Sequence, residues 1–100
     1  MSFGERIKEL RDSQGLLQRQ LAASLEIDTP MYSKIERGER RAKREQVLKI
    51  AKLLQTDTDE LLTVWLADQV YEIVKDEETA AGALKVAEDT LKYSKIVKHV

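Results

Sequence analysis

Apolar residues recur at helical spacing along this chain, and no segment alternates apolar and polar residues as a strand does. Phe3, Ile7 and Leu10, for example, lie on one face of a helix. The stripes in the first part of the chain predict five helices, which begin near residues 3, 17, 28, 45 and 57. The pattern therefore predicts an all-α fold.

The second and third predicted helices are short and joined by a tight turn. Ala22 is small enough to let the two helices cross closely, and Tyr32 and Ile35 are predicted to point inward. Pro30 falls in the first turn of the third helix, where its missing N–H breaks no hydrogen bond, and Gly38 ends that helix. This is the layout of a DNA-reading helix-turn-helix.

Charge is distributed unevenly along the chain, although the net charge is only -1. Between Lys34 and Lys52 there are eight basic and three acidic residues, whereas from Thr63 onward there are five basic and seven acidic ones. Lys and Arg side chains neutralise DNA phosphates and release counterions. The basic segment is therefore predicted to face DNA, and the C-terminal segment is not.

Composition argues against several other classes of protein, including disulfide-bonded, membrane-spanning and catalytic ones. One hundred residues with 42% hydrophobic content suit one globular domain, and the absence of cysteine excludes disulfides and fits a reducing cytoplasm. No apolar run is long enough for a membrane span or a secretory signal. The sequence has no paired carboxylates, glycine-rich phosphate loop or metal-ligand spacing, and the single histidine, His99, lies near the end. We therefore expect no enzyme, no cofactor or metal, and no small-molecule ligand.

The segment Leu17–Leu62 resembles the lambda-repressor-like domain of the Xre/Cro family of bacterial and phage transcription regulators, and residues 3–11 resemble that family's first helix. The matches include Leu17-Gln18, Leu21-Ala22, Ile27, Ser33-Lys34-Ile35-Glu36-Arg37-Gly38, Lys49-Ile50-Ala51, Leu54 and Asp59-Glu60-Leu61-Leu62. The resemblance implies a five-helix helix-turn-helix domain over residues 1–62. It also implies that the domain binds operator DNA as a dimer, with the helix of residues 28–37 in the major groove.

Three positions depart from the family pattern. Glu26 and Gln55 stand where the family often has glycine or asparagine, so a left-handed backbone there costs about 1 kcal/mol at each residue. Asp28, at the head of the recognition helix, satisfies the helix N-terminus but repels a nearby phosphate.

Candidate DNA contacts follow from geometry together with the resemblance. The residues predicted to face base edges are Thr29, Pro30, Met31, Ser33 and Lys34, of which Lys34 can reach guanine O6 and N7. The residues predicted to hold the DNA backbone are Gln18, Arg37, Arg40, Arg41, Lys43 and Arg44. Other interpretations stay open: Met31 packs inside, Gln18 only favours the helix, and the basic run is a solvated loop. Glu36 is predicted to be structural, capping or pairing within the domain.

Residues 63–100 are predicted to form a C-terminal helical extension. One stripe runs through Leu62, Leu66, Val70 and Ile73, and a second through Ala80, Leu84, Ala87 and Leu91, with the spacing of a helix-helix seam. So short a segment cannot bury both stripes by itself. We expect a homodimer assembled through Leu66, Val70, Ile73, Leu84, Ala87 and Leu91; the alternative is a tail folded over its own core.

These patterns predict a cytoplasmic, sequence-specific transcriptional regulator that reads double-stranded DNA as a homodimer, either a repressor or a controller of restriction-modification genes. No membrane partner is expected. The alternative function is an antitoxin-like module that binds another protein through its C-terminal helices and regulates its own gene through the helix-turn-helix.

Overall fold

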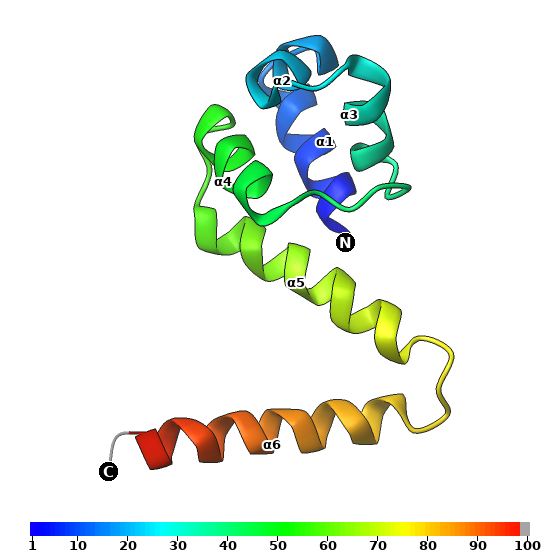
Figure 1. Ribbon diagram of the computed structural model, residues 1–100, viewed down its shortest axis with the longest axis vertical. Coiled ribbons are helices and arrows are strands. Elements are labelled where there is room, and N and C mark those ends of the chain that lie inside the picture. The colour runs from blue at the N-terminus through cyan, green and yellow to red at the C-terminus, as the bar shows by residue number, and fades with distance from the viewer. Residues whose placement is uncertain (99–100) are drawn as a thin grey trace. The chain divides into compact units, whose positions relative to one another are not determined.

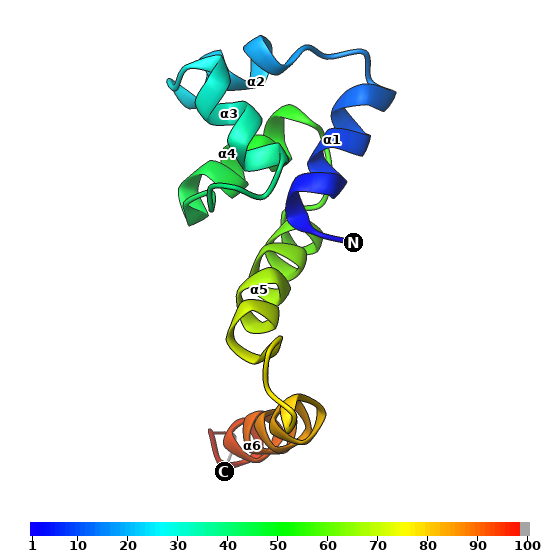
Figure 2. The ribbon, with the colours of Figure 1, turned by 90° about the vertical axis from the view of Figure 1, so that its right-hand side faces the viewer.

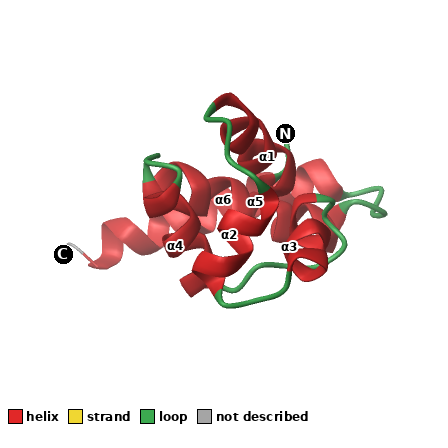
Figure 3. Cartoon of the chain, turned by 90° about the horizontal axis from the view of Figure 1, so that it is seen from above, coloured by secondary structure: helices red, strands yellow, loops and turns green. Residues whose placement is uncertain are grey.

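A computed structural model of the protein describes the backbone of residues 1–98 and the side chains as far as Lys95. This part of the chain contains helices and no strand, which confirms the all-α prediction (Figures 1 and 3). The helices in chain order are α1 (Phe3–Ser13), α2 (Gln18–Leu25), α3 (Thr29–Glu36), α4 (Arg44–Leu53), α5 (Thr58–Val74) and α6 (Ala80–Lys98). Two units are distinguished, Met1–Asp68 and the part from Gln69 onward, and α5 contributes to both.

Local sequence signals set the ends of α3. The carboxylate of Asp28 caps the helix by accepting a hydrogen bond of 2.8 Å from the backbone N–H of Met31. Pro30 lies in the first turn, as predicted, and the left-handed backbone of Gly38 (φ 76°) ends the helix. Residues close to one another in sequence therefore define the length of the predicted recognition helix.

The two non-glycine residues expected in a left-handed conformation adopt it. Glu26 has φ 57° and follows α2, while Gln55 has φ 52° and follows α4. Each costs about 1 kcal/mol relative to an ordinary backbone conformation. Each turn follows a helix whose apolar face is buried in the core, and the free energy gained by that burial offsets the cost of the left-handed residue.

The core of the N-terminal unit is built from the apolar faces of its helices. Its buried residues are Phe3, Ile7, Leu21, Ala22, Leu25, Tyr32, Ile35, Ala42, Val47, Ile50, Ala51, Leu54 and Leu61. The predicted inward positions of Ala22, Tyr32 and Ile35 are thus confirmed. Burying each large side chain contributes about 1.5–3 kcal/mol.

One apolar residue of α4 is not part of the core. The spacing of apolar residues groups Leu48 with Val47, Ala51 and Leu54 in one stripe, which predicts an inward position, but the side chain of Leu48 is 44% exposed. The buried face of α4 runs through Val47, Ile50, Ala51 and Leu54, and Leu48 lies outside that arc at 100° per residue. Leu48 therefore contributes little to the core.

Gly4 marks the closest approach of α1 to α3. A Cβ atom built there lies 2.8 Å from the carbonyl oxygen of Ile35 and even closer to that of Glu36. Because both neighbours are backbone atoms, only a residue without a side chain permits this crossing. The apolar pattern of the sequence did not identify Gly4.

The unit from Gln69 onward contains the last turns of α5 and the whole of α6. On one face of α6, Lys85 pairs with Asp89 at 3.4 Å and Lys92 with Glu88 at 2.8 Å, which stabilises the helix modestly. Another face carries apolar side chains, including the exposed Leu84. Among the described residues, no helix has the length and apolar character that a bilayer crossing requires.

Candidate nucleic-acid interface

The solvent-facing side of α3 carries the side chains predicted to face base edges. Thr29, Pro30 and Lys34 are exposed, and Met31 and Ser33 are half-buried. The opposite side of the helix packs into the core. Figure 2 shows the short turn that joins α2 to α3, the arrangement that a helix-turn-helix needs to present its second helix. The structure therefore leaves these five side chains at least partly accessible, which is compatible with the predicted contacts.

Four of the predicted backbone-binding residues lie at the surface in the basic loop, residues 40–44, which comprises the end of the connection between α3 and α4 together with Arg44, the first residue of α4. Arg40, Arg41, Lys43 and Arg44 are all exposed, whereas Ala42 in their midst is only 3% exposed. Ala42 belongs to the hydrophobic core and anchors the loop there. Its burial makes the basic residues on both sides project into solvent, where DNA phosphates can reach them.

Trp65 on α5 contacts this basic loop. Its indole Nε1–H donates a hydrogen bond of 2.8 Å to the backbone carbonyl of Ala42. The guanidinium of Arg44 lies over the indole ring, 5.3 Å from its centroid, within range of a cation–π interaction. The spacing of residues along the sequence does not predict these contacts. The only signal was that Trp65 is the single tryptophan, whose N–H needs a partner when the ring is buried.

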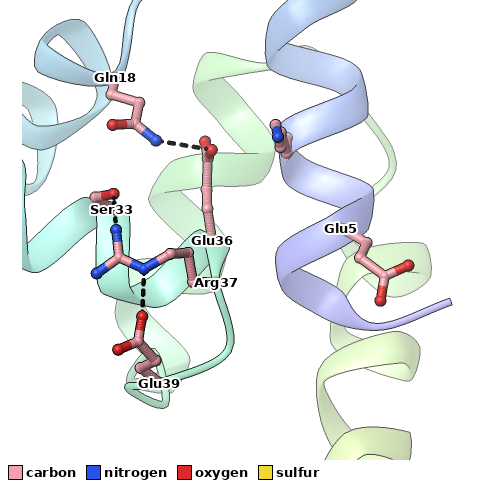
Figure 4. A pocket seen from close by; sticks show the side chains of 7 residues that line it. Glu5, Gln18, Ser33, Glu36, Arg37 and Glu39 are labelled. Carbon is pink, nitrogen blue, oxygen red and sulfur yellow. Dashed lines mark hydrogen bonds and ion pairs between the residues drawn. The ribbon is translucent and has the colours of Figure 1, made fainter.

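Arg37, which follows the last residue of α3, is engaged by neighbouring side chains. Its guanidinium donates hydrogen bonds to the Ser33 hydroxyl and to the carboxylate of Glu39 (Figure 4). The pair with Glu39 is half exposed on both sides, so it contributes at most about 1 kcal/mol. A DNA phosphate can therefore replace Glu39 as the partner of Arg37 at small cost.

Glu36 forms a buried ion pair beneath this surface. Its side chain is only 2% exposed and accepts two hydrogen bonds from Arg11, at 2.7 Å from Nε and 3.2 Å from Nη2. Gln18 Nε2 donates a third hydrogen bond of 3.0 Å (Figure 4). The structural role predicted for Glu36 is confirmed.

Gln18 links the buried pair to the surface. Only one of the two N–H groups of its amide is used by Glu36, so the other is available to a phosphate oxygen. The hydrogen bond to Glu36 also fixes the orientation of the amide. Gln18 therefore combines an internal structural contact with a position compatible with the predicted phosphate contact.

Burial and hydrogen bonding have opposite effects on the pKa of Glu36. Burial raises the pKa of its carboxyl group, but the hydrogen bonds from Arg11 and Gln18, together with the positive charge of Arg11, outweigh burial and hold the pKa below the usual 4.5. A carboxyl group whose pKa is lower in the folded state stabilises the fold above its unfolded pKa. That stabilisation is lost as the pH falls through the folded pKa.

We therefore expect the free energy of unfolding to decrease as the pH falls from about 4.5 through the lower pKa of folded Glu36. Glu36→Gln should remove this part of the pH dependence, because an amide does not titrate. Urea denaturation over a series of pH values measures it, with the exposed Glu39→Gln variant as the matched control. A Glu36→Gln profile as steep as that of the wild type would contradict the assignment.

An open cleft of about 660 Å³ lies between α1, the start of α2 and the end of α3. Its lining residues are Glu5, Lys8, Gln18, Ser33, Glu36, Arg37 and Glu39 (Figure 4). Both signs of charge line the cleft, so it has no strong preference for an anion. Within the described part of the chain, no cluster of His, Cys, Asp and Glu side chains could hold a metal ion. His99, to which no role was assigned, lies outside the described residues.

Comparison with known proteins matches the region that carries these residues. The family described as Helix-turn-helix matches residues 7–61. Among solved structures, the chain is similar to the high-resolution crystal structure of the restriction-modification controller protein C.AhdI from Aeromonas hydrophila. The two sequences are 37% identical, and the TM-score of the two structures is 0.54. That match covers 59% of this chain and 86% of the controller chain. A search of curated proteins found no match.

Proposed function

This chain belongs to the Xre/Cro-type helix-turn-helix family of DNA-binding regulators, and from that premise we propose that it controls transcription by binding operator DNA as a homodimer. The observation that carries the proposal is the surface formed by α3 and the basic loop. An accessible helix face lies next to four exposed cations, within the part of the chain that matches the family. Residues 1–62 form the proposed DNA-binding domain and residues 63–100 the proposed dimerisation extension.

The proposed contacts divide into two classes. Thr29, Pro30, Met31, Ser33 and Lys34 read base edges in the major groove, and Lys34 donates to guanine. Phosphates are held by Gln18, Arg37, Arg40, Arg41, Lys43 and Arg44. The accessibility of these side chains supports both assignments.

We further propose that the regulated genes are those of a restriction-modification system. The support is the likeness to C.AhdI, which is itself a restriction-modification controller protein. A general repressor is the second candidate within the same class. An antitoxin-like role has no specific observation in its favour. The proposed place of action is the cytoplasm, because the proposed partner is double-stranded DNA.

Selection of bound sequences from a random pool of DNA duplexes tests the proposed function. We expect enrichment of a symmetric motif, because the two subunits of a dimer read two half-sites about 34 Å apart or a multiple of that distance. Enrichment of a single asymmetric half-site would contradict dimeric binding. No enrichment at all would contradict sequence-specific regulation.

The apolar residues of the extension support a homodimer. Leu66, Val70, Ile73, Leu84 and Leu91 are between 42% and 76% exposed in the single chain, and Ala87 is exposed as well. Apolar side chains repeated at this spacing on a soluble helix favour burial against a partner. A second copy of the same chain suits a symmetric operator, which needs two identical recognition helices.

Leu84→Asp combined with Leu91→Asp should produce a monomer, because it places two carboxylates in the proposed seam. Affinity for the selected symmetric operator should fall to that for a single half-site. Sedimentation velocity measures the oligomeric state, and circular dichroism checks the fold of the N-terminal unit. Leu48→Asp is the matched control, since Leu48 is about as exposed as Leu84 but lies on α4. A double variant that stays dimeric with normal affinity would leave the extension without its proposed role.

A further inference from the structure

We propose that Trp65 is a positioning residue for DNA binding, which holds the basic loop and the Arg44 guanidinium in the arrangement that meets the phosphate backbone. The inference rests on the proposed role of Arg40, Arg41 and Arg44 in holding phosphates. It adds a residue that makes no proposed DNA contact of its own.

The first step is the anchoring of the loop backbone. Loops on a protein surface are ordinarily mobile, and ordering them during binding costs conformational entropy. Here the side chain of Ala42 is buried in the core, and its carbonyl oxygen accepts the 2.8 Å hydrogen bond from the indole of Trp65. The loop is therefore fixed at its centre from both its side chain and its backbone before DNA arrives.

The second step is the orientation of a cation. The guanidinium of Arg44 lies over the indole ring, 5.3 Å from the ring centroid. A cation–π interaction uses the positive charge of the guanidinium and occupies none of its N–H groups with a hydrogen-bond acceptor, so these N–H groups stay available to accepting oxygens. Arg44 is exposed, so a phosphate can reach those N–H groups. Trp65 thus limits the rotamers of Arg44 without competing for its donors.

The hydrophobic core of the domain holds the indole of Trp65 in place. Trp65 is half-buried and packs against the hydrophobic core, so its indole is held by the same side chains that stabilise the N-terminal unit. A ring fixed in this way can position a loop, whereas a solvated ring cannot. Trp65 therefore acts on phosphates through Ala42 and Arg44.

Binding of the full chain to a mixed-sequence DNA duplex over a range of salt concentrations tests the proposal. Trp65→Phe keeps an aromatic ring but removes the N–H, and the dissociation constant should rise by about 3- to 10-fold, the value of one hydrogen bond. The slope of log affinity against log salt should stay unchanged, because no charge is removed. Arg44→Ala should instead flatten that slope by about 0.9.

Two further variants separate positioning from simple destabilisation. Val64→Ala weakens packing at the neighbouring half-buried position of α5 without removing an indole, and it should bind DNA with wild-type affinity. Trp65→Leu combined with Arg44→Ala should lose less affinity than the two single losses multiplied together, because the tryptophan acts partly through the arginine.

The results of these experiments can overturn the positioning role of Trp65 without overturning the proposed DNA-binding function. Wild-type affinity in Trp65→Phe and Trp65→Leu, with a flattened slope in Arg44→Ala, would overturn the positioning role and leave the proposed function intact. An unchanged slope in Arg44→Ala would remove the phosphate contact of Arg44 and overturn the positioning role with it. An affinity loss in Val64→Ala as large as that in Trp65→Phe would show that packing of α5 in general affects DNA binding, and would overturn the specific positioning role of Trp65.

Discussion

Arg11→Ala should destabilise the N-terminal unit by about 3–5 kcal/mol, because it leaves the carboxylate of Glu36 buried without its charge partner. The side chain of Glu36 is 2% exposed, so water cannot replace the two hydrogen bonds that Arg11 donates. Arg11 also donates to the backbone carbonyl of Leu16, which ties α1 to the loop that precedes α2. Domains of this size have only about 5–15 kcal/mol of stability, so this loss is a large fraction of the total.

Thermal and urea denaturation of the full chain measure this loss. The midpoint temperature should fall by roughly 12–40 °C, because 1 kcal/mol corresponds to about 4–8 °C in a domain of 60–100 residues. Arg6→Ala is the matched control, since the 2.7 Å pair of Arg6 with Glu60 is only partly buried and contributes at most about 1 kcal/mol. If the Arg11 and Arg6 variants lost equal stability, the buried pair would not have the importance assigned to it.

The second large effect concerns DNA. Replacing Arg40, Arg41 and Arg44 together with Ala should reduce the slope of log affinity against log salt by about 2.7, since each phosphate contact contributes about 0.9. Near 0.1 M salt the affinity for every sequence should fall by roughly 100- to 1000-fold. The reason is that all three side chains are exposed on a loop anchored by the buried Ala42, so none of them is needed for the core.

Two comparisons make this result specific. Replacing Lys85, Lys92 and Lys95 of α6 with Ala changes the net charge by the same amount outside the proposed interface, and the slope should be preserved. Lys34→Ala should change the preference at one base pair by about 1–3 kcal/mol. A triple arginine variant that kept the wild-type slope would contradict the phosphate role of the loop, and a uniform loss in Lys34→Ala would make Lys34 a phosphate contact.

Much of this architecture was determined by residues close together in sequence. The apolar spacing predicted the helices of the N-terminal unit, and Asp28, Pro30 and Gly38 predicted where α3 begins and ends. These predictions succeed because a helix stripe and its caps depend on contacts within a few residues of the chain. Resemblance to a family added the left-handed conformations of Glu26 and Gln55, which the residue types alone do not favour.

The contacts that complete the candidate site were decided by tertiary structure. Sequence spacing cannot show that a Cβ atom at position 4 would meet the backbone of α3. Nor can it show that the indole N–H of Trp65 on α5 donates to the carbonyl of Ala42 in the basic loop. The pairing of Arg11 with Glu36 likewise joins α1 to α3 across 25 positions of the chain. Each of these interactions depends on the packing of whole helices, because it forms between segments that have no local reason to be neighbours.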